Sequence, residues 1–361
     1  MKRALGVLAA FAFALAAPHQ PSPRFAAPTS CWDKTADERG IAQADMPDIA
    51  APHAIMVDAN GTVLYERAAD EQVKIASITK VMTALVALDH AELTDTVTVD
   101  HAAATVGEST SNLKEGDTLS VEDALRALLI PSGNDAAMAI ATSVGALIDP
   151  ASSDSYQTFI DAMNEKAAEL GMKDSMFENP HGLDFDEWAG SMHATARDVA
   201  TMVAAAMHND TFRAIVGQGD ADIAVTAADG SAKTLHLRDV NQLVGIEGNI
   251  GVKTGLTDDA GSCFAGAFAR EEGEIYTVVL GCAEPSEEVK KTVQEPRFVD
   301  TLALVAWYSE HMVTSDAVTS EVRDTEGRAI AGRATLADWS DKTVTVVAAD
   351  PSQQVTYFDL G

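Results

Sequence analysis

Residues 76–88 join a polar first turn to a long apolar run, and this combination constrains the fold more than any other stretch. Ser77 and Lys80 are three residues apart, so on a helix they lie on one face. The run from Val81 to Leu88 carries no charge, which predicts a buried helix. Burial disfavours the ammonium form of Lys80 and favours a neutral amine, a potential base beside the Ser77 hydroxyl. A plain polar helix start with a lysine that reaches solvent is the alternative interpretation.

The overall composition excludes some classes of partner. The chain has 361 residues, 47% of them hydrophobic, and a formal net charge of -30. Such a length accommodates a large domain and a small one, and the apolar content is typical of a globular protein. The negative field repels nucleic acid and anionic membrane surfaces, so neither is expected as a partner.

The N-terminus has the pattern of a secretory signal. Lys2 and Arg3 precede an apolar run from Ala4 to Ala17, which is too short for a comfortable transmembrane helix. We assign residues 1–27 to a signal peptide, with the cleavage position left open, and residues 28–50 to a flexible tether. Export of the protein is therefore expected.

Strand-like segments enclose a helical middle. Asn60-Gly61 separates two short apolar runs, which predicts a β-hairpin over His53–Val57 and Thr62–Arg67. Strands at both ends with helices inserted between them predict an α+β domain whose terminal strands share one sheet. A short strand is expected near Thr96–Val99. The predicted helices are Ser77–His90, Val121–Ile130 with Ser120 as cap, Asp135–Leu147, Phe159–Leu170, Thr195–His208 and Pro296–His311, and the later strands are Gly251–Gly255, Ser262–Arg270 and Ile275–Cys282.

We place the main domain at residues 51–312. Beyond it, short runs rich in Val and Thr, such as Thr343–Val347 and Val355–Phe358, predict a small β-rich module over residues 313–361.

The cysteines leave two alternatives open. Cys263 and Cys282 lie on the two arms of a predicted hairpin, and a symmetric turn centred on Glu272-Gly273 places them opposite each other. An exported protein permits a disulfide there. A bulge at Gly273 shifts the register and leaves two buried free thiols instead. The spacing has no zinc signature, so no metal is expected.

Three short motifs occur in the order that one kind of serine chemistry requires. Ser77-Ile78-Thr79-Lys80 opens a helix, Ser132-Gly133-Asn134 follows Pro131 in a turn, and Lys253-Thr254-Gly255 lies on a predicted strand. Each motif alone is weak, but the ordered set resembles the signature of active-site-serine penicillin-binding proteins and serine β-lactamases.

Longer motifs narrow the resemblance to the secreted serine D-alanyl-D-alanine carboxypeptidases, which are low-molecular-weight penicillin-binding proteins. The resemblance covers roughly His53 to His311, and the β-rich tail is similar to their second domain. The motifs are Ser132-Gly133-Asn134-Asp135-Ala136, Asn179-Pro180-His181-Gly182-Leu183, Thr195-Ala196-Arg197-Asp198 and Gly251-Val252-Lys253-Thr254-Gly255.

This resemblance implies a fold and an activity. The implied fold is α+β, with a five-stranded antiparallel sheet, flanking helices and a helical subdomain, followed by the small β-rich module. The implied activity is hydrolysis of the terminal D-Ala-D-Ala bond of peptidoglycan pentapeptide stems in the cell envelope, through an acyl-serine and without a cofactor. Covalent inhibition by β-lactams is implied as well.

The motifs carry roles in this chemistry. Ser77 is the expected nucleophile and Lys80 its proton acceptor. Ser132 is expected to relay a proton to the leaving amine, and Asn134 to orient Lys80 and hold a substrate amide. The backbone N–H groups of Ser77 and Leu256 are the expected oxyanion hole.

The third motif is expected to bind substrate. Lys253 adds positive charge that keeps Lys80 neutral, and together with Thr254 it can hold a substrate carboxylate. Gly255 is expected to let an extended substrate approach the strand edge. Leu256 is apolar where many relatives carry His or an aromatic residue, so only its backbone role is expected.

Four further positions or pairs near these motifs carry weaker signals. Val240 stands before Asn241 where some relatives carry an arginine, and Arg238 is a weak substitute for it. We expect His181 to brace a loop rather than act as an acid or base. Asp258-Asp259 lacks the further ligand spacing of a metal site.

Two rival functions come from different classes. A related β-lactamase needs a deacylating base, for which Glu178 is the tempting residue. A catalytically silent module that binds wall or senses β-lactams is the other rival, and the intact motifs argue against it. The chain has neither a Gly-x-Ser-x-Gly elbow nor a His-Glu-x-x-His zinc motif.

Overall fold

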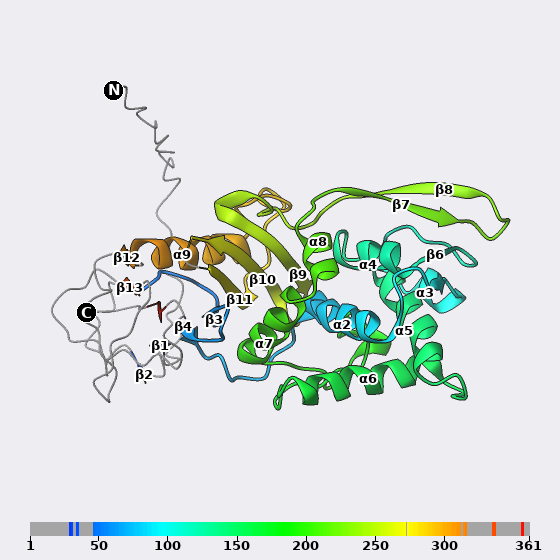
Figure 1. Cartoon of the computed structure of the whole chain (residues 1–361), viewed down its shortest axis with the longest axis horizontal. Coiled ribbons are helices and arrows are strands. Elements are labelled where there is room, and N and C mark those ends of the chain that lie inside the picture. The colour runs from blue at the N-terminus through cyan, green and yellow to red at the C-terminus, as the bar shows by residue number, and fades with distance from the viewer. Residues whose placement is uncertain are drawn as a thin grey trace, which may run out of the picture.

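The computed structural model describes residues 46–271 and 273–311, together with five short strands outside these ranges. A seven-stranded antiparallel sheet runs through it in the order β2-β1-β4-β3-β11-β10-β9 (Figure 1). Five of these strands, from β4 to β9 in that order, form the predicted five-stranded sheet, and β1 and β2 extend it beyond β4. The strands are β1 (Thr29–Cys31), β2 (Lys34–Thr35), β3 (His53–Asp58), β4 (Val63–Arg67), β9 (Asn249–Thr257), β10 (Gly261–Arg270) and β11 (Gly273–Cys282).

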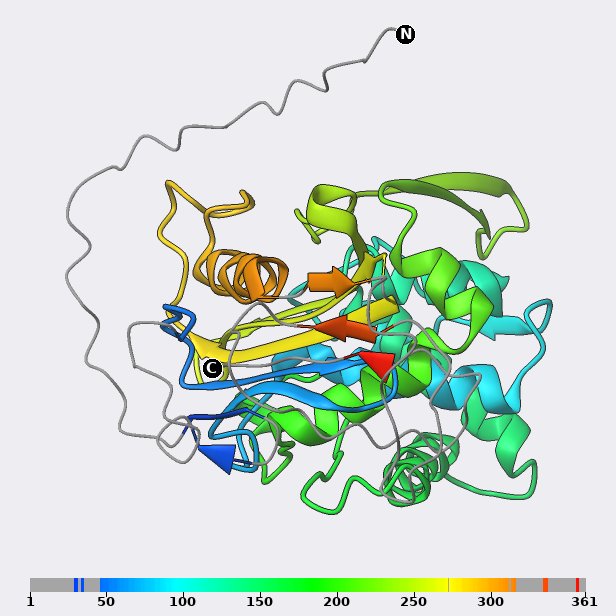
Figure 2. The same ribbon diagram turned by 60° about the vertical axis from the view of Figure 1, so that its left-hand side comes forward.

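Each face of this sheet carries its own hydrophobic core, because side chains alternate along the strands. On β3, Ile55 and Val57 join the larger core with the middle helices, whereas Ala54 and Met56 join the core that contains α9. Helices α7 and α9 consequently lie on opposite faces of the sheet (Figure 2). Their bounds are α7 (Ala196–Met207) and α9 (Pro296–His311), which confirms the helix predicted for residues 296–311.

The packed part of the chain begins before residue 51, inside the segment that the sequence assigned to a tether. Met46 and Ile49 are buried in the core beside α9. The carboxylate of Asp300 accepts hydrogen bonds from the backbone N–H groups of Ala50 and Ala51, the latter at 2.7 Å. These contacts attach residues 46–51 to α9.

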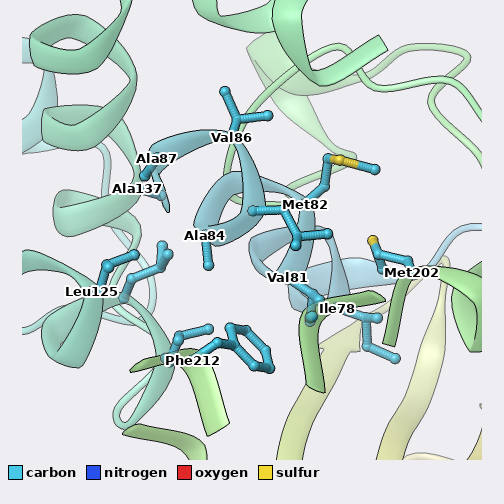
Figure 3. Packing of buried hydrophobic residues seen from close by; sticks show 14 of the residues in the cluster. Ile78, Val81, Met82, Ala84, Val86, Ala87, Leu125, Ala137, Met202 and Phe212 are labelled. Carbon is cyan, nitrogen blue, oxygen red and sulfur yellow. The ribbon is translucent and has the colours of Figure 1, made fainter. Parts of the chain in front are cut away.

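Helix α2 is buried within the helical subdomain, as its uncharged, mostly apolar run predicts. Its side chains are enclosed by Leu125, Ala137 and Met202 from three neighbouring helices (Figure 3). The predicted helix start at Ser77 is a 3-10 turn, η2, and the α-helix begins at Lys80. The helices are η2 (Ala76–Thr79), α2 (Lys80–His90), α3 (His101–Thr105), α4 (Val121–Leu129), α5 (Asn134–Ile148), α6 (Ser155–Glu169) and α8 (Asp210–Val216).

A second, four-stranded sheet flanks these helices in the order β5-β6-β7-β8. The sequence predicted only its first strand, near Thr96–Val99. The strands β7 and β8 were missed. Along each of them, buried or half-buried residues alternate with exposed ones, and Asp229-Gly230 between them is a typical hairpin turn. The strands are β5 (Thr96–Thr98), β6 (Thr118–Ser120), β7 (Ala221–Thr226) and β8 (Ala232–Leu237).

Most of the two predicted terminal segments, the signal peptide and the β-rich module, lies outside the described residues. The whole of the signal peptide, residues 1–27, lies outside them. Of the predicted β-rich module, three short strands are described, and they form a sheet in the order β12-β13-β14. Within the described residues, no helix has the length and apolarity needed to cross a membrane. The strands are β12 (Val313–Ser315), β13 (Ala334–Leu336) and β14 (Val355–Thr356).

The hairpin register decides between the two alternatives for the cysteines. Arg270 pairs with Gly273, and a bulge between Ser262 and Phe264 then shifts the pairing so that Ser262 lies opposite Cys282. Cys263 therefore faces the core of the middle helices, and Cys282 faces the core beside α9. Both thiols are free and buried, because side chains on opposite faces of a sheet cannot form a disulfide. Of the two alternatives left open by the sequence, the structure has the two buried free thiols.

We expect the thiols to be reduced and protected in the folded protein. Burial raises the pKa of the Cys263 thiol to about 11 and raises that of Cys282 as well, so little reactive thiolate forms at neutral pH. A Cys31→Ser variant, purified without reductant, should react slowly with an aromatic disulfide reagent while it is folded. After denaturation it should release two equivalents of the reagent's coloured thiol per protein chain. Release of none after denaturation would mean that a disulfide exists.

Candidate active site

Ser77 and Lys80 meet at the junction of η2 and α2. The turn begins with Ala76 at φ 47°, a left-handed conformation that is costly for a residue with a side chain. Lys80 Nζ lies 2.8 Å from Ser77 Oγ. The predicted one-turn spacing therefore brings the two groups into hydrogen-bond contact.

Two further acceptors surround the lysine nitrogen. Lys80 Nζ donates to Asn134 Oδ1 at 2.7 Å and to the backbone carbonyl of His181 at 2.8 Å. A neutral amine has two N–H groups and one lone pair. With both N–H groups used by these oxygens, the lone pair is directed toward Ser77 Oγ, which is the arrangement of a base beside a hydroxyl.

The surroundings of Lys80 favour this neutral form. The side chain is fully buried, with 0% exposure. Burial is the main cause that holds the pKa of Lys80 well below its usual range; the nearby Lys253 lowers it further, and Asp135 opposes them. The expected effect of Lys253 on Lys80 thus has a physical basis in the structure.

The turn with Ser132 and Asn134 is held in place by backbone contacts. Ser132 is buried at φ 66°, and the N–H of Asn134 donates to the carbonyl of Ser109. The Asn134 side-chain amide donates to the carbonyl of Gly107 at 3.0 Å, which fixes its oxygen toward Lys80. Ser132 precedes Asn134 by two residues on this same turn.

Asp135 anchors the neighbouring loop to the start of α5. Its buried carboxylate accepts hydrogen bonds from Thr110 Oγ1 at 2.6 Å and from the N–H groups of Ser111 and Leu113. These bonds hold the polar segment 107–117 against α5. The segment that supplies the Gly107 acceptor for Asn134 is therefore itself immobilised.

Strand β9 forms the opposite wall and lies at the edge of the sheet. Lys253 and Thr254 are buried on it, and Lys253 Nζ donates to the carbonyl of Thr254 at 3.0 Å. Burial and the nearby Arg297 lower the pKa of Lys253 to about 7, against the opposing charge of Asp239. Leu256 is half-buried two residues beyond Thr254.

A glycine is needed at position 255 for a packing reason that the sequence did not indicate. A Cβ at this position would lie 2.8 Å from the carbonyl oxygen of Ile75 and 3.2 Å from the backbone nitrogen of Ser77. The glycine therefore lets β9 pack directly against η2. This contact sets the position of β9 relative to Ser77 before any substrate is considered.

Arg297 is a site residue that sequence reasoning missed. It comes from the first turn of α9, donates to the carbonyl of Gly255 at 2.9 Å and forms an ion pair with the buried Glu295. It thus holds β9 from behind and adds positive charge near Lys253. No local pattern indicates this role, because 42 residues separate Arg297 from Gly255.

The loop 179–183 supplies a backbone group and not an imidazole. His181 is fully buried, its ring packs edge-on against Trp188 at 4.5 Å, and its Nδ1 accepts from the N–H of Leu183. Burial, and secondly Lys80, lower the pKa of His181 well below its ordinary value. A neutral, packed ring agrees with the expected bracing role.

The remaining sequence candidates lie at the surface. Arg238, Asp258 and Asp259 are exposed. Among the residues that the structure describes, no group of three or more His, Cys, Asp or Glu side chains is arranged to hold a metal ion.

The antiparallel sheet with helices on both faces is the fold of the penicillin-binding proteins that the resemblance implied, and the Ser77–Lys80 contact lies where η2 packs against its edge strand β9. The profile of the D-alanyl-D-alanine carboxypeptidase family matches residues 40–284, and the chain belongs to this family.

Named relatives agree with this assignment. The chain is 30% identical over 244 residues to the carboxypeptidase DacF of Bacillus subtilis, covering 66% of this chain and 59% of that protein. It is 32% identical over 256 residues to the D-alanyl-D-alanine carboxypeptidase of Streptomyces sp. strain K15, covering 68% and 86%. The alignments thus span less than two thirds of some relatives, such as DacF, and most of others.

Solved structures show the same fold. The Streptomyces K15 DD-transpeptidase superposes with a TM-score of 0.63 at 30% identity, covering 72% of this chain and 97% of that one. The D-alanyl-D-alanine carboxypeptidase of Mycobacterium tuberculosis has a TM-score of 0.60 at 30% identity, covering 73% and 92%.

The coupling of the two lysines predicts a change in pH dependence. Removing the Lys253 charge in Lys253→Met should raise the pKa of Lys80, so the acid limb of the penicillin acylation profile should move to higher pH. Stopped-flow measurement of the maximal acylation rate across pH gives the pH position of this limb, even if Lys253→Met binds penicillin more weakly. Lys173→Met, an equal charge change on an exposed side chain, should leave the limb in place. A limb that stays in place in Lys253→Met as well would contradict the coupling.

Proposed function

We propose that the protein is a serine-type carboxypeptidase that removes the terminal D-alanine from peptidoglycan stem peptides. The observation that carries the proposal is the environment of Lys80. A buried lysine with two carbonyl-type acceptors and a serine oxygen at 2.8 Å is suited to take a proton from that serine. Family membership supplies the substrate class, a peptide that ends in D-Ala-D-Ala.

The proposed reaction begins with acylation. Ser77 Oγ attacks the carbonyl carbon of the penultimate D-alanine while Lys80 accepts its proton. The N–H groups of Ser77 and Leu256 stabilise the resulting oxyanion. The C–N bond then breaks, the leaving amine takes a proton through Ser132, and water later hydrolyses the acyl ester.

Binding roles complete the proposal. Lys253 and Thr254 hold the terminal carboxylate of the substrate, which extends antiparallel to the edge strand β9. Asn134 holds a substrate amide and keeps Lys80 in place. The chemistry uses these side chains and backbone groups alone, without a cofactor. β-Lactams would acylate Ser77 by the same attack, and the signal-like N-terminus supports export to the cell envelope.

The β-lactamase alternative lacks a suitable base at Glu178. Its carboxylate is exposed and accepts hydrogen bonds from Ser191 Oγ and the N–H of Met192, both at 2.8 Å. These bonds outweigh its partial desolvation and lower the pKa of Glu178. A carboxylate engaged in this way braces its own loop and is a poor base for deacylation.

Release of D-alanine tests the proposal directly. A pentapeptide that ends in D-Ala-D-Ala should lose one D-alanine with the full chain, measured by an enzyme-coupled assay for the free amino acid. Ser77→Ala should abolish both this release and labelling by a fluorescent penicillin, because the acyl bond forms at the missing oxygen. Labelling that persists in Ser77→Ala would place the nucleophile elsewhere, and a lack of release by the unaltered chain would reject the activity.

The base is tested separately. Lys80→Ala should slow acylation by about 10²–10⁴-fold, the usual contribution of a general base. Mass spectrometry of the acyl-enzyme over time gives the rate and locates the modified serine. An unchanged rate would remove Lys80 from this role.

A further inference from the structure

Asp184 is a buried carboxylate that the proposed mechanism does not use. The side chain is 5% exposed, and Oδ2 accepts a hydrogen bond from Thr257 Oγ1 at 2.7 Å. The same hydroxyl accepts from the N–H of Ala260 at 3.0 Å, at the turn between β9 and β10. Oδ1 has no hydrogen-bond partner among the described residues. Burying a carboxylate this incompletely satisfied is costly, so its position needs a reason.

The loop that carries Asp184 is one wall of the site. Asn179 closes it, because its side chain donates to the carbonyl of Leu183 and accepts from the N–H of Gly182. A Cβ at Gly182 would lie 2.0 Å from the carbonyl oxygen of Ala76, so this loop rests on the residue before the nucleophile. The loop also presents the His181 carbonyl that accepts from Lys80.

Strand β9 is the other wall, and it rests on the same turn. Gly255 packs on Ile75 and Ser77, and Leu256 follows it with the backbone N–H proposed for the oxyanion. Thr257 is the next residue. The bond from Thr257 to Asp184 therefore joins the two walls directly, and each wall also contacts the turn η2.

We propose that Asp184 is a positioning residue that fixes the β9 end of the oxyanion hole relative to the loop that orients Lys80. The inference rests on the proposed serine chemistry. Three segments touch pairwise: η2 and the loop at Gly182, η2 and β9 at Gly255, and the loop and β9 through Asp184 and Thr257. Loss of the third contact removes the direct hydrogen bond between the two walls. The placement of each wall then depends on its separate contacts, with η2 and α2 for the loop and with η2, β10 and Arg297 for β9. Catalysis depends steeply on such placement.

A double-mutant cycle tests the pairing. Thr257→Val keeps the shape and removes the donor, and Asp184→Ala removes the acceptor. Each should slow penicillin acylation about tenfold or more, and the double variant should be no slower than the slower single variant. The loss should appear in the maximal acylation rate and not in the half-saturating penicillin concentration, because the substrate carboxylate is held elsewhere. Thr257→Ser keeps the hydroxyl and should restore most of the rate.

Controls separate positioning from general destabilisation. Ser191→Ala removes another hydroxyl-carboxylate bond, to Glu178 at 2.8 Å, that does not join the two walls, and it should acylate like the unaltered chain. All variants are compared at a temperature where thermal unfolding shows them folded. Unchanged acylation in Thr257→Val, or multiplicative losses in the double variant, would overturn the positioning role. Failure of the unaltered chain to be acylated would instead reject the proposed function itself.

Discussion

The burial of one lysine is the constraint on which the rest of the structure depends. Removing an ammonium group from water costs several kcal/mol even after relaxation, so Lys80 is tolerated inside the core only where polar partners surround it. Asn134 and the carbonyl of His181 are those partners. They come from segments far apart in the chain, and each is fixed by its own hydrogen bonds. Much of the middle third of the chain is thus arranged around a single nitrogen atom.

A second constraint is the close approach of backbones around Ser77. Gly255 on β9 and Gly182 on the neighbouring loop each lack the Cβ that would collide with the turn η2. The nucleophile therefore lies between two surfaces that contact it through the main chain. Such contacts are rigid because a backbone cannot rotate away as a side chain can. Arg297 reinforces them from the far side of β9 by binding the carbonyl of Gly255.

Much of the fold was predictable from local patterns. The uncharged, mostly apolar run after Lys80 predicted a buried helix. Ser120 and Thr195 predicted helix starts that the structure confirms with side-chain caps. The short apolar runs on either side of Asn60-Gly61 predicted the first hairpin, which the structure has as β3 and β4. The ribbon β7-β8 was missed although Asp229-Gly230 marks its turn, because its alternating residues carry little hydrophobic signal.

The sequence by itself determined the chemistry: which serine, lysines and asparagine are available, in what order, and on what kind of element. Only the tertiary structure decided how these groups meet and what holds them. A bulge in the β10–β11 hairpin puts Cys263 and Cys282 on opposite faces, and the start of α9 brings Arg297 behind β9. Both outcomes depend on strand register and on contacts between distant segments, which local patterns do not encode.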